Sequence, residues 1–74
     1  MIGGWRTLRR RAMIVSLDTG RSFEGVLYDT TGPLLVLRNA RALEPGRDAM
    51  PLDGELVVDR SRVEFLQLTK PVVP

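Results

Sequence analysis

The stretch from Val15 to Asn39 constrains the fold more strongly than any other part of the chain. It contains an alternating apolar segment, a tight turn ending at Gly20, a second segment interrupted by Gly25, a glycine-proline loop and a third apolar segment. A glycine inside a strand permits a sharp bend or a close approach of another backbone, and barrel corners need such bends. The order therefore predicts the first half of a small, strongly bent antiparallel barrel.

Alternation and turn residues set the expected strand boundaries. We expect five strands, over residues 13–18, 21–29, 34–40, 54–59 and 63–68. Residues 34–37 are apolar at every position, which predicts that the third strand is covered on both faces. Residues 41–51 are the hardest stretch to assign: their Glu-Pro-Gly step indicates a turn, and Met50-Pro51 is expected to resume an extended path. Residues 13–69 are thus expected to form one small barrel domain.

The first twelve residues form a basic arm. They contain four arginines and no acid, a net charge of +4, whereas the rest of the chain contains seven bases and nine acids, a net charge of −2. Trp5, Leu8 and Ala12 fall at helical spacing, which predicts one short amphipathic helix. A helix this short is not stable alone in water, so we expect it to dock, on the barrel in preference to a partner. Residues 70–74 contain two prolines and are expected to form an extended tail.

The size of the chain indicates that something besides its core stabilises it. A domain of 74 residues buries only about 60% of the surface that its unfolded chain exposes. The sequence contains no cysteine and no histidine, which excludes disulfides and argues against a structural zinc site. Assembly is the remaining source of stability. No cofactor is expected. The longest apolar runs are four residues, against the roughly 20 that a bilayer span needs, so no membrane partner is expected.

A short helix followed by five strands, with glycines in the second and fourth, is typical of Sm-like, SH3-like and OB-type barrels. Among these, the chain resembles the Sm and LSm family over about 50 of its residues. The positions that fit the first family motif are Val15, Leu17, Gly20, Arg21, Gly25, Leu27, Leu35, Leu37 and Ala40. Those that fit the second are Gly54, Leu56, Val58, Val63 and Leu66. The expected fold is an all-β, five-stranded, strongly bent antiparallel barrel (Sm-like or SH3-like) preceded by a short helix.

The resemblance implies assembly through strand edges. An open barrel leaves two edges whose backbone groups invite pairing with a neighbour, and in the family strand four of one subunit pairs with strand five of the next. The self-association seam expected here consists of Leu56, Val57, Val58, Val63, Phe65 and Leu66. Phe65 and Phe23 are also expected to contribute to the core.

The departures from the family concentrate at its base-binding pocket. The resemblance implies an aspartate and an asparagine in the loop between strands two and three, but Gly32 or Pro33 stands near the asparagine position. The arginine-glycine pair of the second motif reads Asp59-Arg60. The resemblance therefore implies that base binding in the usual pocket is lost.

A second, looser resemblance covers the whole chain. The start Trp-Arg-x-Leu-Arg, the strands Phe-Glu-Gly-Val-Leu and Gly-Pro-Leu-Leu-Val-Leu-Arg-Asn-Ala, and the ending Val-Glu-Phe-Leu-Gln-Leu are similar to small proteins encoded among the head and portal genes of tailed actinobacterial phages. This resemblance implies a minor virion component at the capsid or head-tail region, with capsid or portal proteins as partners. The implied location is the virion or the host cytoplasm.

Catalysis is not expected, because histidine and cysteine are absent and Ser16, Ser22 and Ser61 have no visible activating base. Asp53 and Glu55 are explained by a solvated strand edge better than by a cation site. The chain is interpreted as a non-enzymatic assembly protein, with a divergent RNA- or DNA-binding ring as the alternative. Tyr28 is expected in the core in preference to a base-stacking role. The residues expected to contact a partner or nucleic acid are Trp5, Arg6, Arg9, Arg10 and Arg11.

Overall fold

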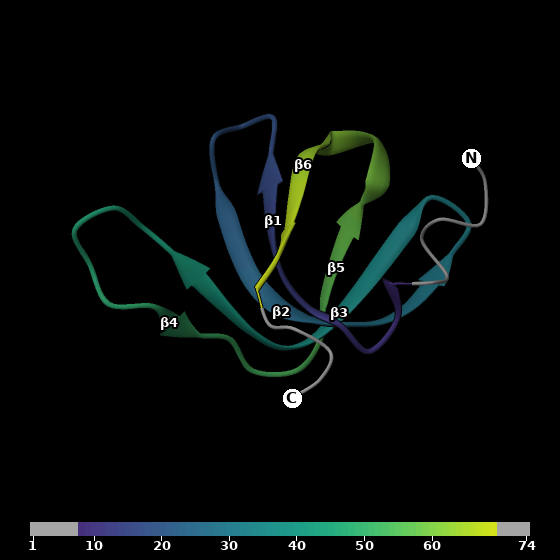
Figure 1. Ribbon diagram of the computed structural model, residues 1–74, viewed down its shortest axis with the longest axis horizontal. Helices are drawn as coiled ribbons and strands as arrows, with labels where there is room; N and C mark the ends of the chain where they lie inside the picture. Colours follow the sequence, from purple (N-terminus) through teal and green to yellow (C-terminus); the bar gives the residue numbers. More distant parts are fainter. Residues whose placement is uncertain (1–7, 70–74) are drawn as a thin grey trace.

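The computed structural model describes residues 8–69, which form one strongly curved sheet (Figure 1). A 3-10 helix, η2 (Arg60–Arg62), connects the last two strands. The strands are β1 (Ala12–Leu17), β2 (Ser22–Thr31), β3 (Leu34–Leu43), β4 (Met50–Pro51), β5 (Leu56–Asp59) and β6 (Val63–Leu68). The predicted all-β, strongly bent antiparallel architecture is confirmed.

All strand pairs are antiparallel, in the order β4-β3-β2-β1-β6, and β5 also pairs with β3. The β3 residues that pair with β4 and β5 also pair with β2. Because a strand has only two edges, β4 and β5 must share the edge of β3 that faces away from β2. The sheet therefore ends in β4 and β5 on one side and in β6 on the other.

The largest difference between the expected and the observed strands concerns residues 41–51, which show no alternating pattern in the sequence. β3 continues to Leu43, and the two residues of β4 return beside it, so the two strands form a hairpin that projects from the side of the barrel (Figure 1). The predicted fourth strand starts later than expected, at Leu56, after Gly54 adopts a φ of 76°. The turn at Gly54 separates β4 from β5.

The predicted N-terminal helix lies mostly outside residues 8–69, and where it overlaps them its last part is wrong. Arg10 has a φ of 66°, and Ala12 opens β1 instead of completing a helical face. The Arg10 N–H donates to the Leu27 carbonyl (2.6 Å), and the Leu27 N–H donates to the Arg11 carbonyl (3.1 Å). Pairing with β2 satisfies these backbone groups in an extended path, so the helical spacing does not decide the structure here. The predicted tail over residues 70–74 also lies outside the described part.

The sharp bend of β2 and β3 occurs where Gly25 faces two residues of β3. Glu24 pairs with Arg41 and Val26 pairs with Arg38, which leaves Asn39 and Ala40 opposite Gly25 as a bulge. A Cβ atom at Gly25 would lie 3.3 Å from the Arg38 carbonyl oxygen. Asn39 has a φ of 54°, a conformation that asparagine tolerates better than most residues. The close backbone approach expected at Gly25 is confirmed.

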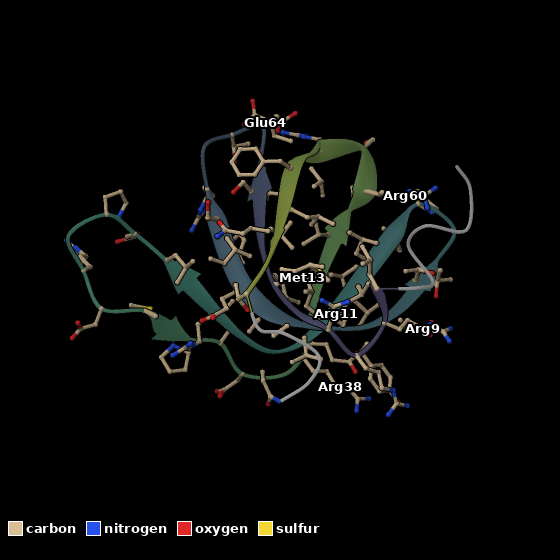
Figure 2. All side chains as sticks on the ribbon, in the orientation of Figure 1. Arg9, Arg11, Met13, Arg38, Arg60 and Glu64 are labelled. Atoms are coloured by element: carbon tan, nitrogen blue, oxygen red, sulfur yellow. The ribbon has the colours of Figure 1, made fainter. Side chains whose placement is uncertain are left out.

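The core lies inside the bend, and Figure 2 shows Met13 at its centre. Its buried members are Met13, Val15, Leu27, Leu35, Leu37 and Val58. On β3, Leu35 and Leu37 are buried, whereas Leu34 is 38% exposed and Val36 is half-buried. The prediction that β3 is covered on both faces is wrong, because the curved sheet buries only its inner face.

Candidate functional site

The two ends of the sheet are open edges. Within residues 8–69, β5 pairs only with β3 and β6 pairs only with β1. Each of these strands exposes a large apolar side chain: Val57 on β5 is 54% exposed and Phe65 on β6 is 57% exposed. Unpaired backbone groups beside exposed apolar side chains are the features that favour pairing with another strand.

The residues of the predicted seam all lie on these two strands, but they do not play equal parts. Val58 is buried in the core, and Leu56, Val63 and Leu66 are partly buried against it. Val57 and Phe65 alone of the six are exposed. The expectation that Phe65 contributes to the core is wrong: it pairs with Ser16 and projects from the outer face of β6, opposite in direction to Leu66.

The loop between β2 and β3 meets the connection between β5 and β6. The Arg60 N–H donates to the Pro33 carbonyl at 2.7 Å. Asp59 caps η2, since its Oδ1 accepts from the Ser61 N–H (2.9 Å) and from Ser61 Oγ (2.8 Å). These hydrogen bonds, with the nearby Arg62 and Arg60 guanidinium groups, hold the pKa of the Asp59 carboxyl below its usual value. Asp59 in its ionised form therefore stabilises the turn that contains η2.

The predicted arginine cluster does not form a single surface. Arg9 pairs with Asp29 at 3.0 Å, and Arg10 is exposed with no ion-pair partner among the residues that the structure describes. Arg11 is half-buried, and its Nε is buried without a hydrogen-bond partner in the same region. Figure 2 shows Arg9 directed away from the barrel and Arg11 within its outline. Trp5 and Arg6 lie outside the described residues.

Tyr28 and Arg38 form an exposed pair that the sequence did not reveal. The guanidinium carbon of Arg38 lies 3.5 Å from the centroid of the Tyr28 ring, and Arg38 Nε donates to Glu55 Oε2 at 2.9 Å. Tyr28 is 39% exposed, so the expectation that it packs in the core is wrong. The pairing register shifts between Leu27 and Asp29. Simple alternation therefore could not show which face Tyr28 occupies.

Comparison with known proteins decides the fold. No family model matches this sequence, and no curated protein matches it. Among solved structures, a heptameric archaeal Sm protein superposes with a TM-score of 0.76 at 19% identity, covering 89% of this chain and 96% of the other. The chain has the Sm-like fold.

Two further solved structures resemble this barrel, and each was solved as part of a complex. The Sm protein of Pyrococcus abyssii, solved in complex with a uridine heptamer, has a TM-score of 0.74 at 21% identity and covers 88% of this chain and 92% of its own. A chain of the NatC complex bound to CoA has a TM-score of 0.72 at 25% identity, with coverages of 90% and 86%. These structures lend no support to the resemblance to phage proteins, and the virion role stays a prediction.

Other kinds of site are not evident in the described part of this Sm-like barrel. Residues 8–69 contain no group of three or more histidine, cysteine, aspartate or glutamate side chains placed to hold a metal ion. No helix in that range is long and apolar enough to cross a membrane. The open edges and the surface around Tyr28 are therefore the candidate functional features.

Proposed function

We propose that the protein is a non-enzymatic subunit that assembles with copies of itself through the open edges of β5 and β6, and that the assembly binds single-stranded nucleic acid. The observation that carries this proposal is the pair of unpaired edges, each with an exposed apolar side chain, Val57 or Phe65. The heptameric state of the archaeal Sm neighbour supports the assembly, and the uridine complex of the Pyrococcus neighbour supports the ligand class.

Burial at the edges supplies the stability that this small core lacks. Fully burying a side chain such as Phe65 or Val57 stabilises by about 1.5–3 kcal/mol. In the proposed assembly, one copy presents its β5 edge to the β6 edge of the next. A contact between unlike surfaces is head-to-tail and forms a ring when the rotation between copies closes.

The assembly is tested by placing a charge on each edge. Val57→Asp and Phe65→Asp should each weaken the contact by about 3–5 kcal/mol, because the interface would bury a carboxylate without a partner. Both side chains are more than half exposed in the single chain, so its fold should persist. Sedimentation velocity and native mass spectrometry measure the association, and circular dichroism checks the fold.

The matched control for this test is Thr31→Asp, which adds the same charge at the exposed end of β2, a strand that is paired on both sides and forms neither open edge. It should assemble like the unaltered protein. An unaltered protein that stays monomeric at high concentration would contradict the proposed assembly. Full assembly of both edge variants would contradict it as well.

The proposed nucleic-acid surface surrounds Tyr28. Proteins bind single strands by stacking bases on aromatic rings and guanidinium planes and by neutralising phosphates with cations. The exposed Tyr28–Arg38 pair provides the stacking surface. The Arg10 backbone is bonded to Leu27, the residue before Tyr28, so the exposed Arg10 side chain starts beside this pair. Arg10 is the cation proposed to contact phosphate.

Binding is tested with a fluorescently labelled single-stranded uridine oligomer in an anisotropy titration at several salt concentrations. Tyr28→Ala should weaken binding by about 1–3 kcal/mol, the usual effect of removing a stacking aromatic. Arg10→Ala should also weaken the salt dependence of binding. The slope of the logarithm of the dissociation constant against the logarithm of the salt concentration should fall by about one, as expected for the loss of one phosphate contact. The control is Arg47→Ala, which removes an exposed arginine paired with Glu44 on the β3–β4 hairpin. Unchanged affinity in both Tyr28→Ala and Arg10→Ala would remove this surface from the proposal.

A further inference from the structure

An apolar groove borders β4 and β5. It has two adjoining parts, of about 320 Å³ and 150 Å³, that share Arg21 and Phe23 as lining residues. Met50, which is 61% exposed, lines the smaller part. The apolar side chains along the groove are Leu17, Phe23, Ala42, Met50, Leu52, Leu56, Val57 and Val58.

The groove follows the same open edge to which the proposed neighbour adds. The Leu52 N–H donates to the Ala40 carbonyl at 2.9 Å, so residues 50–52 and β5 both lie along β3. The turn at Gly54 separates these two segments. A strand added beyond β5 therefore continues past Gly54 toward Leu52 and Met50.

The direction and length of the neighbour's chain fit this path. Every pairing in the sheet is antiparallel, and an antiparallel β6 laid beside β5 runs toward Gly54. β6 has six residues and β5 has four, so a neighbour's β6 that covers all of β5 extends past at least one of its ends. The five residues that follow Thr69 reach about 17 Å when extended. Residues 50–55 precede β5 along the same side of β3, and an extended segment of this length covers most of that stretch.

We propose that residues 70–74 of one copy occupy the groove beside β4 and β5 of the next copy. This inference rests on the edge assembly proposed above. Four of the five residues are proline or valine, which suit an apolar groove, and prolines are tolerated beside an edge strand because they need not donate to a ladder. Lys70 brings a positive charge toward Asp53, a carboxylate with no ion-pair partner within residues 8–69.

The neighbouring copy is the source that the topology favours. The Thr69 N–H donates to the Ala12 carbonyl, so the segment of the same copy leaves the sheet beside β1. In the strand order β1 and β6 stand at the opposite end from β4, and the curvature of the sheet brings Gln67 of β6 and the hairpin residues Glu44 and Pro45 to one cavity. Residues 70–74 of the next copy instead begin where β6 of that copy lies against β5 of the first. The single-chain disulfide in the test below is therefore the outcome that distinguishes the two sources.

Disulfide trapping tests the placement, since the natural sequence contains no cysteine. A Met50→Cys protein is mixed with a Val73→Cys protein, allowed to exchange subunits, and oxidised. A disulfide requires Cα atoms about 4.4–6.8 Å apart, so we expect a covalent pair that contains one copy of each variant. The matched control replaces Met50→Cys with Pro45→Cys, on the same hairpin but outside this groove, and should give little product.

The outcomes separate the two proposals. Native mass spectrometry before oxidation reports the assembly itself, and an assembly that forms without trapping above the control overturns the tail placement alone. A double variant, Met50→Cys with Val73→Cys, that closes only within single chains also overturns it. Absence of any assembly overturns the proposed function together with this inference. A chain shortened to end at Thr69 should still assemble, with a dissociation constant roughly tenfold higher, as expected from losing about one buried apolar side chain per contact.

Discussion

A Gly25→Val variant is expected to lose about 3 kcal/mol or more of its free energy of unfolding. The added Cβ would lie 3.3 Å from the Arg38 carbonyl oxygen and 3.3 Å from Leu37 Cβ, and valine carries two further methyl groups on that atom. Overpacking of this kind costs about 1–3 kcal/mol when the backbone can adjust. The backbone of β3 adjusts poorly here, because Asn39 already holds a positive φ to form the bulge.

The loss is large for a domain of this size, whose total stability is expected to be about 4–11 kcal/mol. It corresponds to a decrease in Tm of at least about 12 °C, measured by circular dichroism at a fixed protein concentration. Gly25→Ala should show an intermediate decrease. Thr31→Val places the same β-branched apolar side chain at an exposed strand position and should leave the Tm nearly unchanged. A Gly25→Val protein as stable as the unaltered one would show that the bend does not depend on this glycine.

Leu35→Ala is expected to destabilise the protein by about 2–5 kcal/mol, the usual cost of removing a buried leucine side chain and leaving a cavity. Leu35 is fully buried and pairs with Val58 of β5, so its loss affects both the core and the strand that carries an open edge. Urea unfolding at a fixed protein concentration measures the difference, because assembly adds to the apparent stability.

The matched control is the neighbouring residue. Leu34→Ala removes the same atoms from a side chain that is 38% exposed, and its effect should be well under half that of Leu35→Ala. Equal losses for the two variants would mean that both faces of β3 are covered. The sequence alone had suggested that arrangement, because it shows four consecutive apolar residues and no alternation.

Much of the fold could be predicted because its strands follow simple local rules. Buried Met13 and Val15 of β1 alternate with less buried neighbours as far as Val15, Gly25 shows where β2 bends, and the short connection at Arg60 and Ser61 forms a single 3-10 turn. The β3–β4 hairpin could not be predicted in the same way. β4 contains only Met50 and Pro51, and a strand of two residues has no periodicity to recognise.

The N-terminal arm shows why a helical spacing can mislead. Leu8 and Ala12 are four residues apart, yet Arg10 has a positive φ and Ala12 pairs with Val26 in the sheet. An unpaired edge of β2 competes for the backbone groups of this segment, and the sequence of the segment alone does not reveal that edge. Long-range pairing thus decides a structure that local spacing describes wrongly.

The candidate site was predictable at the level of strands and less so at the level of side chains. The resemblance placed the expected seam on the two strands that have open edges, but Val57 and Val58 differ only in which face they occupy, and one is exposed while the other is buried. The Tyr28–Arg38 pair depends on a register shift in β2 that no residue pattern marks. The face that a side chain occupies beside such a register shift therefore cannot be read from the residue pattern alone.

The open edges on β5 and β6 are unlike, and this gives any assembly of the protein a polarity. A copy with a charge in place of Phe65 keeps a sound β5 edge, so it can join one neighbour and then offers nothing to the next. An assembly that has added such a copy cannot add another subunit at that end. A small proportion of these copies therefore stops the growth of assemblies made mostly of unaltered subunits. The angle between successive copies follows from how β5 is turned relative to β6. The bend at Gly25 and Asn39 contributes to that angle, so in the proposed assembly a change at either residue, remote from the seam, is expected to alter the number of copies per ring.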